Sequence, residues 1–324
     1  MRAITLSGFG EPDVLTFSDD TDAPTPRPGE VLIRVVASGV NRADLLQRQG
    51  FYPPPRGESD LLGLEVSGRI EALGEGVTGW TVGDDCLALL AGGGYAELVA
   101  VPSGQVLAPP EGVELVTAAG LIEVAATVVS NFDHVNLSAG ERVLIHGGAG
   151  GIGSFAIQYA VAIGAKPLVT AGSAAKLELC RSLGADLAFD YHDDWAAAVR
   201  EATQGRGVDV ILDVIGAKYL ESNVASLALD GRLVVIGLQG GQKGTLNLGA
   251  LLNKRATVTA TSLRGRPAEQ KAAICARVAE VVWPLITAGR ITLAPPTRFA
   301  ISDAARAHEH LASGQNTGKI VLVW

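Results

Sequence analysis

The sequence predicts an α/β protein in which a β-rich part precedes a doubly wound parallel sheet. Three observations support this prediction. Short strand-like runs separated by Gly and Pro turns fill residues 1–120. Strand-like and helix-like stretches then alternate as far as residue 264, which is typical of a parallel sheet with crossover helices. A glycine-rich turn at residues 147–153 joins the first strand of this alternation to its first helix.

Length and composition limit the class of protein. A chain of 324 residues predicts about two domains, and 48% hydrophobic residues are enough for a sizeable core. The net charge of −8, without a Lys/Arg cluster, argues against a nucleic-acid partner. Neither a signal-peptide pattern nor an apolar run of membrane-spanning length is present, so we expect a cytoplasmic protein and no membrane partner. The three cysteines are far apart, which predicts buried thiols rather than disulfides or a C-x-x-C metal site.

The first part of the chain is expected to form a barrel or a partly open barrel. Each of its strand-like runs is bounded by a Gly or Pro turn. A short helix or irregular segment is expected at 41–49, followed by a rigid loop at 51–56 that contains three consecutive prolines. The predicted strands are 31–37, 66–73, 86–90 and 95–101.

The turn at 147–153 carries the pattern G-x-G-x-x-G in Gly148, Gly150 and Gly153. We expect Gly148 to make the tight turn, Gly150 to let the backbone approach a pyrophosphate, and Gly153 to let the helix pack close to the strand. The N–H groups of Gly151 and Ile152, at the helix start, would then face the anion. The alternative is a glycine-rich turn with only a packing role.

Further elements complete the predicted parallel sheet. Strands are expected at 143–146, 166–170, 187–189, 208–213, 232–238 and 257–262, and helices at 117–132, 152–163, 174–183 and 195–203. A helix at 268–288, interrupted by Pro284, and a returning strand at 319–324 follow the alternation. The second domain is therefore expected to be inserted into the first, with domain limits 1–122 plus 266–324 and 123–265.

The tip of the second strand of the sheet indicates which dinucleotide is bound. An acidic residue there would accept from the ribose 2′-hydroxyl of NAD, but residues 170–176 contain no acid. Ser173, after Gly172, could donate to a 2′-phosphate and Lys176 could neutralise it, which favours NADP. The alternative is a helix N-cap at Ser173 and a solvated lysine. Tyr191 could flank the adenine or its ribose phosphate, or be a surface tyrosine.

Five segments carry a resemblance to a known family: 41–50 (NRADLLQRQG), 63–68 (GLEVSG), 147–153, 169–173 (VTAGS) and 318–321 (GKIV). Over essentially its whole length the chain resembles the zeta-crystallin-like, zinc-independent NADPH quinone oxidoreductases of the medium-chain dehydrogenase/reductase superfamily. The resemblance implies a GroES-like catalytic domain, a Rossmann domain, and NADPH in the cleft between them. It also implies homodimers joined through the Rossmann sheets.

Zinc-dependent relatives carry a cysteine where this chain has Asn41, and Gly-His-Glu where it has Gly63-Leu64-Glu65. Leucine cannot bind zinc, and the four-cysteine structural zinc lobe is absent. We therefore expect no metal site and no alcohol oxidation. Reduction of an electron-poor acceptor by hydride transfer remains feasible.

Two residues are candidates for catalysis. Asn41 could hydrogen-bond the acceptor carbonyl or the nicotinamide ribose, or it could be a loop-capping asparagine. Tyr52 could donate to a developing oxyanion or stack on a flat quinone, or it could pack the proline-rich loop. Some family members carry a tyrosine at the position of Leu46, so no tyrosine role is expected there.

The resemblance adds further residues near the nicotinamide half of the cofactor. For Lys319 a surface role is an open alternative. The five histidines lack metal-ligand spacing and are expected to be ordinary. The added residues are Thr127, Ile236, Gly237, Leu238, Ser262, Leu263, Arg264 and Lys319.

The resemblance and the zinc-free residues together predict an NADPH-dependent quinone reductase acting on a quinone or another flat electron-poor molecule. An enone or alkenal double-bond reductase is the enzymatic alternative, because it would use the same hydride donor. A non-catalytic NADPH-binding protein is an alternative of another class, since some relatives are lens crystallins or bind RNA. The acidic charge argues against RNA, and the retained Asn41 and Tyr52 argue against a non-catalytic role.

Overall fold

The computed structural model describes residues 1–324, which form two compact units. Unit 1 comprises Met1–Ala126, Leu263–Gly289 and Leu293–Trp324, and unit 2 comprises Thr127–Ser262 and Arg290–Thr292. The sequence analysis expected the breaks after residues 122 and 265 and did not foresee the short return segment. That segment is held within unit 2, because Arg290 Nη2 donates to the carbonyl of Ala162 at 2.6 Å.

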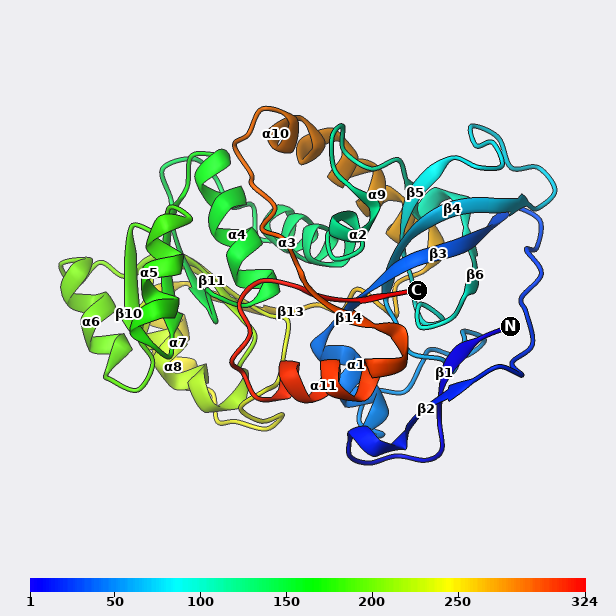
Figure 1. The fold of residues 1–324 in the computed structure, drawn as a ribbon. Helices are drawn as coiled ribbons and strands as arrows, with labels where there is room; N and C mark the ends of the chain where they lie inside the picture. The colour runs from blue at the N-terminus through cyan, green and yellow to red at the C-terminus, as the bar shows by residue number, and fades with distance from the viewer. The chain divides into compact units, whose positions relative to one another are not determined.

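Unit 1 is built around a seven-stranded sheet whose longest strand is β3 (Glu30–Val40). Antiparallel partners of β3 are β4 (Glu65–Leu73), β6 (Leu98–Pro102) and the C-terminal β15 (Ile320–Val323). The strand order does not close into a ring, in agreement with the predicted partly open barrel (Figure 1). The other strands of unit 1 are β5 (Asp85–Leu89), β7 (Val106–Leu107), β14 (Thr297–Ala300) and the separate pair β1 (Ala3–Leu6) and β2 (Leu15–Ser18).

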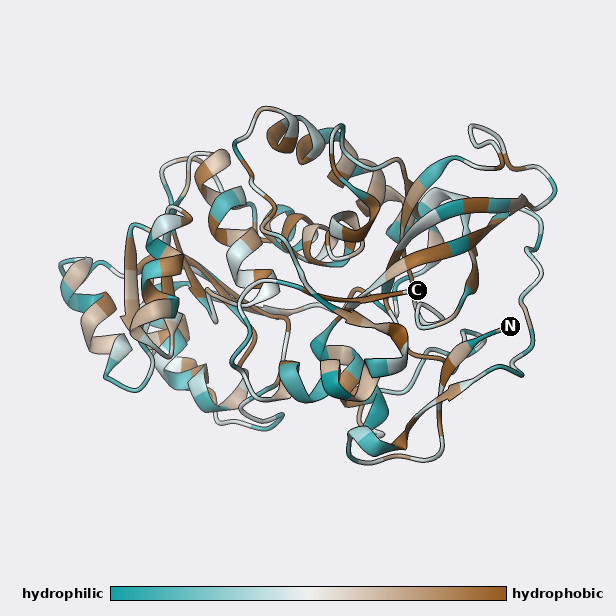
Figure 2. Cartoon of the chain, viewed as in Figure 1, coloured by the Kyte–Doolittle hydropathy of each residue, from teal (hydrophilic) through white to brown (hydrophobic).

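Alternation along β3 explains why this strand organises the unit. Val31, Ile33 and Val35 point to one face, where they pack with Val66 and Ile70 of β4 in one hydrophobic cluster. Figure 2 shows brown, hydrophobic segments along both strands. Burial of this alternating set fixes the register, because a slip by one residue would expose every member.

Helices of unit 1 only partly match the prediction. The single helix expected at 117–132 is wrong: α2 (Leu115–Ala118) is separate from α3 (Ile122–His134), whose residues from Thr127 onward belong to unit 2. The interruption by Pro284 is confirmed, because α9 (Ala268–Val281) ends before it and Pro284 is the second residue of α10 (Trp283–Thr287). The remaining helices are α1 (Arg42–Arg48), α11 (Ala304–Ala312) and the 3₁₀ turns η1 (Pro12–Val14), η2 (Ser103–Gln105) and η4 (Ile301–Asp303).

Unit 2 contains the predicted six-stranded parallel sheet, in the order β10-β9-β8-β11-β12-β13. This order, with the first strand in the middle, is that of a dinucleotide-binding Rossmann sheet. Its strands are β8 (Arg142–His146), β9 (Lys166–Ala171), β10 (Leu187–Asp190), β11 (Val208–Asp213), β12 (Leu227–Val235) and β13 (Thr257–Ala260).

Helix α4 (Gly151–Ala162) packs on β8 and β9, α5 (Ala174–Ser182) packs on β9 and β10, and α6 (Trp195–Ala202) contacts β10 (Figure 1). The sequence analysis missed α7 (Leu220–Ser226), which follows η3 (Ala217–Tyr219), and α8 (Leu248–Lys254); both helices pack against β12. All three cysteines are free and buried, as expected. No helix combines the length and the hydropathy needed to cross a lipid bilayer.

Candidate functional site

Most of the predicted cofactor residues lie at one edge of the unit 2 sheet. Because all six strands are parallel, their carboxyl ends meet at the same edge, which is where such sheets bind nucleotides. Predicted residues directly follow β8, β9, β10, β12 and β13 at this edge. They are Gly148, Gly150, Gly151, Ile152, Gly153, Gly172, Ser173, Lys176, Tyr191, Ile236, Gly237, Leu238 and Ser262.

The roles of the individual glycines in the turn differ in part from the prediction. Gly147, with φ of 74°, takes the left-handed conformation that makes the turn, whereas Gly148 was expected to do so. Gly148 is needed for packing instead, because a Cβ there would lie 2.8 Å from Cys180 Sγ and 2.9 Å from Val169 Cβ. Gly153 allows the helix to approach the strand as predicted, since its Cβ would overlap the Gly147 carbonyl.

Gly150 leaves open space where a pyrophosphate would have to approach. A Cβ at Gly150 would meet only the Gly147 carbonyl oxygen, at 3.5 Å. Gly150 is also the N-cap of α4, so the unpaired N–H groups of the first helical turn follow it. A partly exposed backbone with open space beside a helix N-terminus fits a dinucleotide diphosphate.

The loop after β9 has the features predicted for a 2′-phosphate site. Ser173 caps α5, because its Oγ accepts from the Lys176 backbone N–H at 3.3 Å. This is the capping role considered in the sequence analysis, and a serine Oγ that accepts in a cap keeps its own O–H as a donor. Tyr191 packs against this loop, since a Cβ on Gly172 would overlap the Tyr191 hydroxyl. Within this loop the residues fit a phosphorylated ribose.

Segments expected near the nicotinamide form a tight backbone arrangement after β11 and β12. Ile236 N–H donates to the Asp213 carbonyl at 2.8 Å. A Cβ on Gly237 would lie 2.8 Å from the Val214 carbonyl oxygen, so only glycine fits there. Leu238 is half exposed, and Thr127, on α3, is buried. The nicotinamide roles of these residues remain predictions.

In unit 1, Asn41, Glu65 and Lys319 form a compact polar cluster. Lys319 Nζ donates to Asn41 Oδ1 and to Glu65 Oε1, both at 2.6 Å, and Asn41 Nδ2 donates to Glu65 Oε1 at 2.9 Å. The other carboxylate oxygen, Glu65 Oε2, accepts from the Glu123 N–H near the start of α3 at 3.0 Å. Glu65 is fully buried, whereas the Lys319 side chain keeps 15% of its surface exposed. The ammonium is therefore held by two partners, on a side chain that is not completely buried.

Asp44 supports this cluster by holding the backbone at Asn41. Its carboxylate accepts from the backbone N–H groups of Asn41 at 2.7 Å and Gly63 at 3.1 Å, which fixes the turn that presents Asn41. Burial raises the pKa of Asp44 to about 6, while these two N–H groups oppose the rise. The Tyr95 hydroxyl also contacts Asp44, at 3.4 Å, and its oxygen lies 3.1 Å from His308 Nε2.

Arg264 holds the loop that carries Tyr52. Its guanidinium donates to the carbonyls of Ala91 at 2.7 Å and Tyr52 at 3.1 Å and to Gln47 Oε1 at 2.7 Å. The guanidinium carbon also lies 5.2 Å from the centre of the half-buried Tyr52 ring. Burial lowers the pKa of Arg264. The structure therefore joins Arg264 to Tyr52, although the sequence analysis had assigned it to the cofactor.

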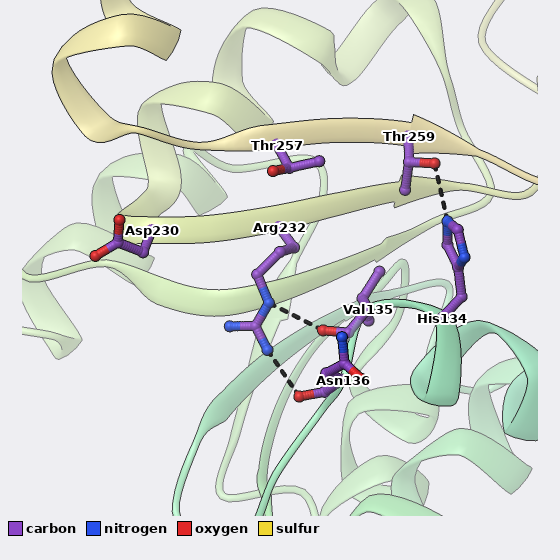
Figure 3. A pocket seen from close by; sticks show the side chains of 7 residues that line it. All are labelled: His134, Val135, Asn136, Asp230, Arg232, Thr257 and Thr259. Carbon is purple, nitrogen blue, oxygen red and sulfur yellow. Dashed lines mark hydrogen bonds between the residues drawn. The ribbon is translucent and has the colours of Figure 1, made fainter.

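The chain brings no three His, Cys, Asp or Glu side chains together in a cluster suited to a metal ion. A separate pocket of about 510 Å³ lies beside β12 and β13 (Figure 3). Arg232 dominates it, but this guanidinium donates to the carbonyls of Val135 and Asn136 and to both oxygens of Glu141. None of the predicted site residues lines this cavity, so it is separate from the candidate site.

Two domain families match the chain: one described as alcohol dehydrogenase GroES-like domain over residues 27–111, and one described as zinc-binding dehydrogenase over residues 151–278. A quinone oxidoreductase of Pseudomonas aeruginosa is 34% identical over 326 residues, covering 99% of each chain. The chain belongs to the quinone oxidoreductase family of the medium-chain dehydrogenase/reductase superfamily.

Solved structures agree with this assignment. The quinone oxidoreductase of Escherichia coli in complex with NADPH superimposes with a TM-score of 0.90 at 29% identity, covering all of both chains. The CurK enoyl reductase gives a TM-score of 0.86 at 28% identity over 99% of this chain. The GroES-like and Rossmann fold prediction is confirmed.

The sequence analysis missed three parts of the site. Glu65 was quoted in a motif but not recognised as the buried partner of Asn41 and Lys319. Asp44 was not considered, although an acid three residues after the Asn41 N-cap is a signal for a capping carboxylate. His146, at the end of β8, was treated as ordinary, but both of its ring nitrogens are hydrogen-bonded.

Proposed function

We propose that the protein is a zinc-independent reductase that uses NADPH to reduce a quinone or another flat electron-poor acceptor. The observation that carries the proposal is the cluster of Asn41, Glu65 and Lys319. It offers an amide and a held ammonium, but no cysteine or histidine that could bind zinc. An acceptor that needs no Lewis acid suits such a site, and the quinone oxidoreductases of the family act on acceptors of this kind.

NADPH supplies the hydride when bound, and two features of unit 2 favour it over NADH. The loop after β9 contains no acid to bind a free 2′-hydroxyl. Ser173 and Lys176, in its place, suit a 2′-phosphate. The open backbone at Gly150 suits the diphosphate.

In unit 1, the Asn41 amide and the Lys319 ammonium are proposed to stabilise the negative charge that develops on the acceptor oxygen. Lys319 has three N–H donors, of which two are used by Asn41 and Glu65, so one is left for the acceptor. Groups already held in place need no reorganisation as charge develops. Tyr52, fixed by Arg264, is proposed to stack on the flat acceptor or to donate from its hydroxyl. The cofactor contact expected of Arg264 stays a prediction.

A double-bond reductase is the second candidate, because an enoyl reductase superimposes over nearly the whole chain. An enone carbonyl would also gain from the amide and the ammonium.

We further propose a homodimer formed through β13, the last strand of its sheet, whose outer edge has no partner strand. The exposed Leu248 and Leu252 of α8 would extend this interface. Free, buried cysteines suit the proposed cytoplasmic location.

Turnover measurements with a panel of ortho- and para-quinones, enones and simple alcohols test the proposal. We expect quinones to support NADPH oxidation, and we expect no oxidation of simple alcohols by NADP. Asn41→Ala should lower kcat for the best acceptor by about a hundredfold, as for loss of one oxyanion donor. Rapid alcohol oxidation, or NADPH binding without turnover of any acceptor, would contradict the proposal.

A further inference from the structure

We propose that His146 is a positioning residue for the adenosine end of the cofactor site, acting through Thr170. This inference rests on the proposed use of NADPH. It concerns three side chains at the carboxyl ends of adjacent strands and one on a helix: Thr170 near the end of β9, His146 at the end of β8, Asp213 at the end of β11, and Asn223 on α7. Together they form one buried chain of hydrogen bonds beneath the glycine turn.

The geometry of this chain is continuous. His146 Nδ1 lies 3.0 Å from Thr170 Oγ1, and His146 Nε2 lies 2.7 Å from Asn223 Oδ1. Asn223 Nδ2 donates to Asp213 Oδ2 at 3.1 Å. Every member is almost completely buried, so water does not compete for these bonds.

Asp213 sets the direction of the whole chain. As a carboxylate it accepts from the N–H groups of Ile215 at 2.6 Å and Gly216 at 3.0 Å, and it therefore faces the amide nitrogen of Asn223. Asn223 Oδ1 is then an acceptor, so the proton of the neutral imidazole lies on Nε2. His146 Nδ1 is left to accept, and Thr170 Oγ–H must donate to it. Burial lowers the pKa of His146 to about 4, so the ring is uncharged at neutral pH.

Aromatic contacts fix the imidazole in place. The rings of Trp195 and Tyr219 meet it edge-on, with centroids at 4.8 Å and 4.9 Å. His308 is equally buried but uses only one ring nitrogen, because its Nε2 contacts the Tyr95 hydroxyl and its Nδ1 has no partner. In His146 both nitrogens are used, one toward Thr170 of β9 and the other toward Asn223 of α7.

Thr170 is where the chain meets the cofactor site. Its carbonyl accepts from the N–H groups of Gly147 at 3.1 Å and Gly148 at 2.9 Å, which anchors the glycine turn to β9. Gly172 and Ser173 follow it in sequence after Ala171. One residue therefore links the turn proposed for the diphosphate to the loop proposed for the 2′-phosphate. Because His146 holds the Thr170 hydroxyl, it keeps the glycine turn and the loop after β9 at a fixed spacing.

The experiment measures the affinity of folded variants for 2′,5′-ADP, which probes the adenosine end alone, and for NADPH, by calorimetry. Thr170→Val removes the hydroxyl at nearly constant shape, whereas Thr170→Ser keeps it. We expect Thr170→Val to weaken 2′,5′-ADP about tenfold, as expected for one buried hydrogen bond. Thr170→Ser should remain within about twofold of wild type, within the usual scatter of such values. His146→Leu should resemble Thr170→Val if it folds, and His310→Leu, at a partly exposed histidine of α11, is the control for loss of an imidazole outside this chain of hydrogen bonds.

The outcomes separate this inference from the proposed function. Wild-type protein that fails to bind NADPH overturns the proposed cofactor, and the inference with it. The inference alone is overturned if wild-type protein binds NADPH and Thr170→Val leaves the dissociation constant for 2′,5′-ADP unchanged. A lower melting temperature of Thr170→Val would not rescue it, because the chain of hydrogen bonds would then be only structural. Nitrogen-15 NMR of wild type should show the imidazole protonated on Nε2, and protonation on Nδ1 would contradict the argument.

Discussion

The ammonium of Lys319 lies 2.6 Å from the Glu65 carboxylate, and the Glu65 side chain is completely buried. Glu65 is on β4 and Lys319 directly precedes β15, and both strands pair with β3. A buried carboxylate is stable only when it is paired, and here the pairing also holds the Asn41 amide. Stability and proposed catalysis therefore depend on the same ion pair.

Removal of Lys319 should be costly because it leaves Glu65 buried and unpaired. Lys319→Met is expected to lower the free energy of unfolding by about 3–5 kcal/mol. The double variant with Glu65→Gln should recover part of this loss, since the uncompensated charge is gone. Urea unfolding of the two single variants and the double variant gives the coupling energy.

Arg255 and Asp230 provide the matched control, because they form an ion pair that is mostly exposed. Arg255→Met should lower the free energy of unfolding by less than about 1 kcal/mol. Similar losses at both pairs would show that Lys319 and Glu65 behave as an ordinary surface pair.

Activity should not depend on zinc. The positions where zinc-dependent relatives carry ligands hold Asn41 and Leu64 in this chain, and leucine offers no ligand atom. We expect purified protein to contain no stoichiometric zinc and to retain quinone turnover in a chelator. Elemental analysis that finds one zinc per chain, with turnover lost on its removal and restored by its return, would refute this prediction.

Lys176 should distinguish NADPH from NADH. A hydrogen bond to a charged group is worth about 1.5–3 kcal/mol, and about 1.4 kcal/mol corresponds to a tenfold change in affinity. Lys176→Ala should therefore weaken NADPH binding by about one to two orders of magnitude and leave NADH binding nearly unchanged. High salt should weaken wild-type NADPH binding more than NADH binding. Equal losses for both cofactors would assign Lys176 to the fold instead.

Asp44 should make stability depend on pH below neutrality. Its folded-state pKa of about 6 lies above the ordinary value of 3.8, so the native state binds the proton more tightly than the unfolded state. The stability that this group contributes is fully present below pH 3.8 and is lost as the pH rises through 6. Two pKa units correspond to at most about 3 kcal/mol. Urea unfolding between pH 4 and 7 should show that the free energy of unfolding falls less with rising pH in Asp44→Asn than in wild type. The same dependence on pH in both proteins would contradict the assignment.

Local sequence was sufficient to predict most of unit 2. The strand at β8, the glycine turn and the helical face of α4 are determined by neighbouring residues, because period and turn chemistry act over a few positions. Even there, the exchange of tasks between Gly147 and Gly148 was not predicted, since Gly148 is restricted by Cys180 on α5. The short α7 and α8 carried too few turns for a clear periodic signal.

The sequence by itself determined the fold class, the family and the residue types at the site: an amide at position 41, leucine at 64, and serine and lysine after β9. Only the tertiary structure decided which of them act together. Lys319 meets Asn41 and Glu65 because β15 returns from the end of the chain to pair with β3. His146 meets Thr170 because β8 and β9 are parallel neighbours, and it meets Asn223 of α7, whose amide is held by Asp213 at the end of β11. Such contacts depend on strand pairing between distant segments, and local patterns carry no information about that pairing.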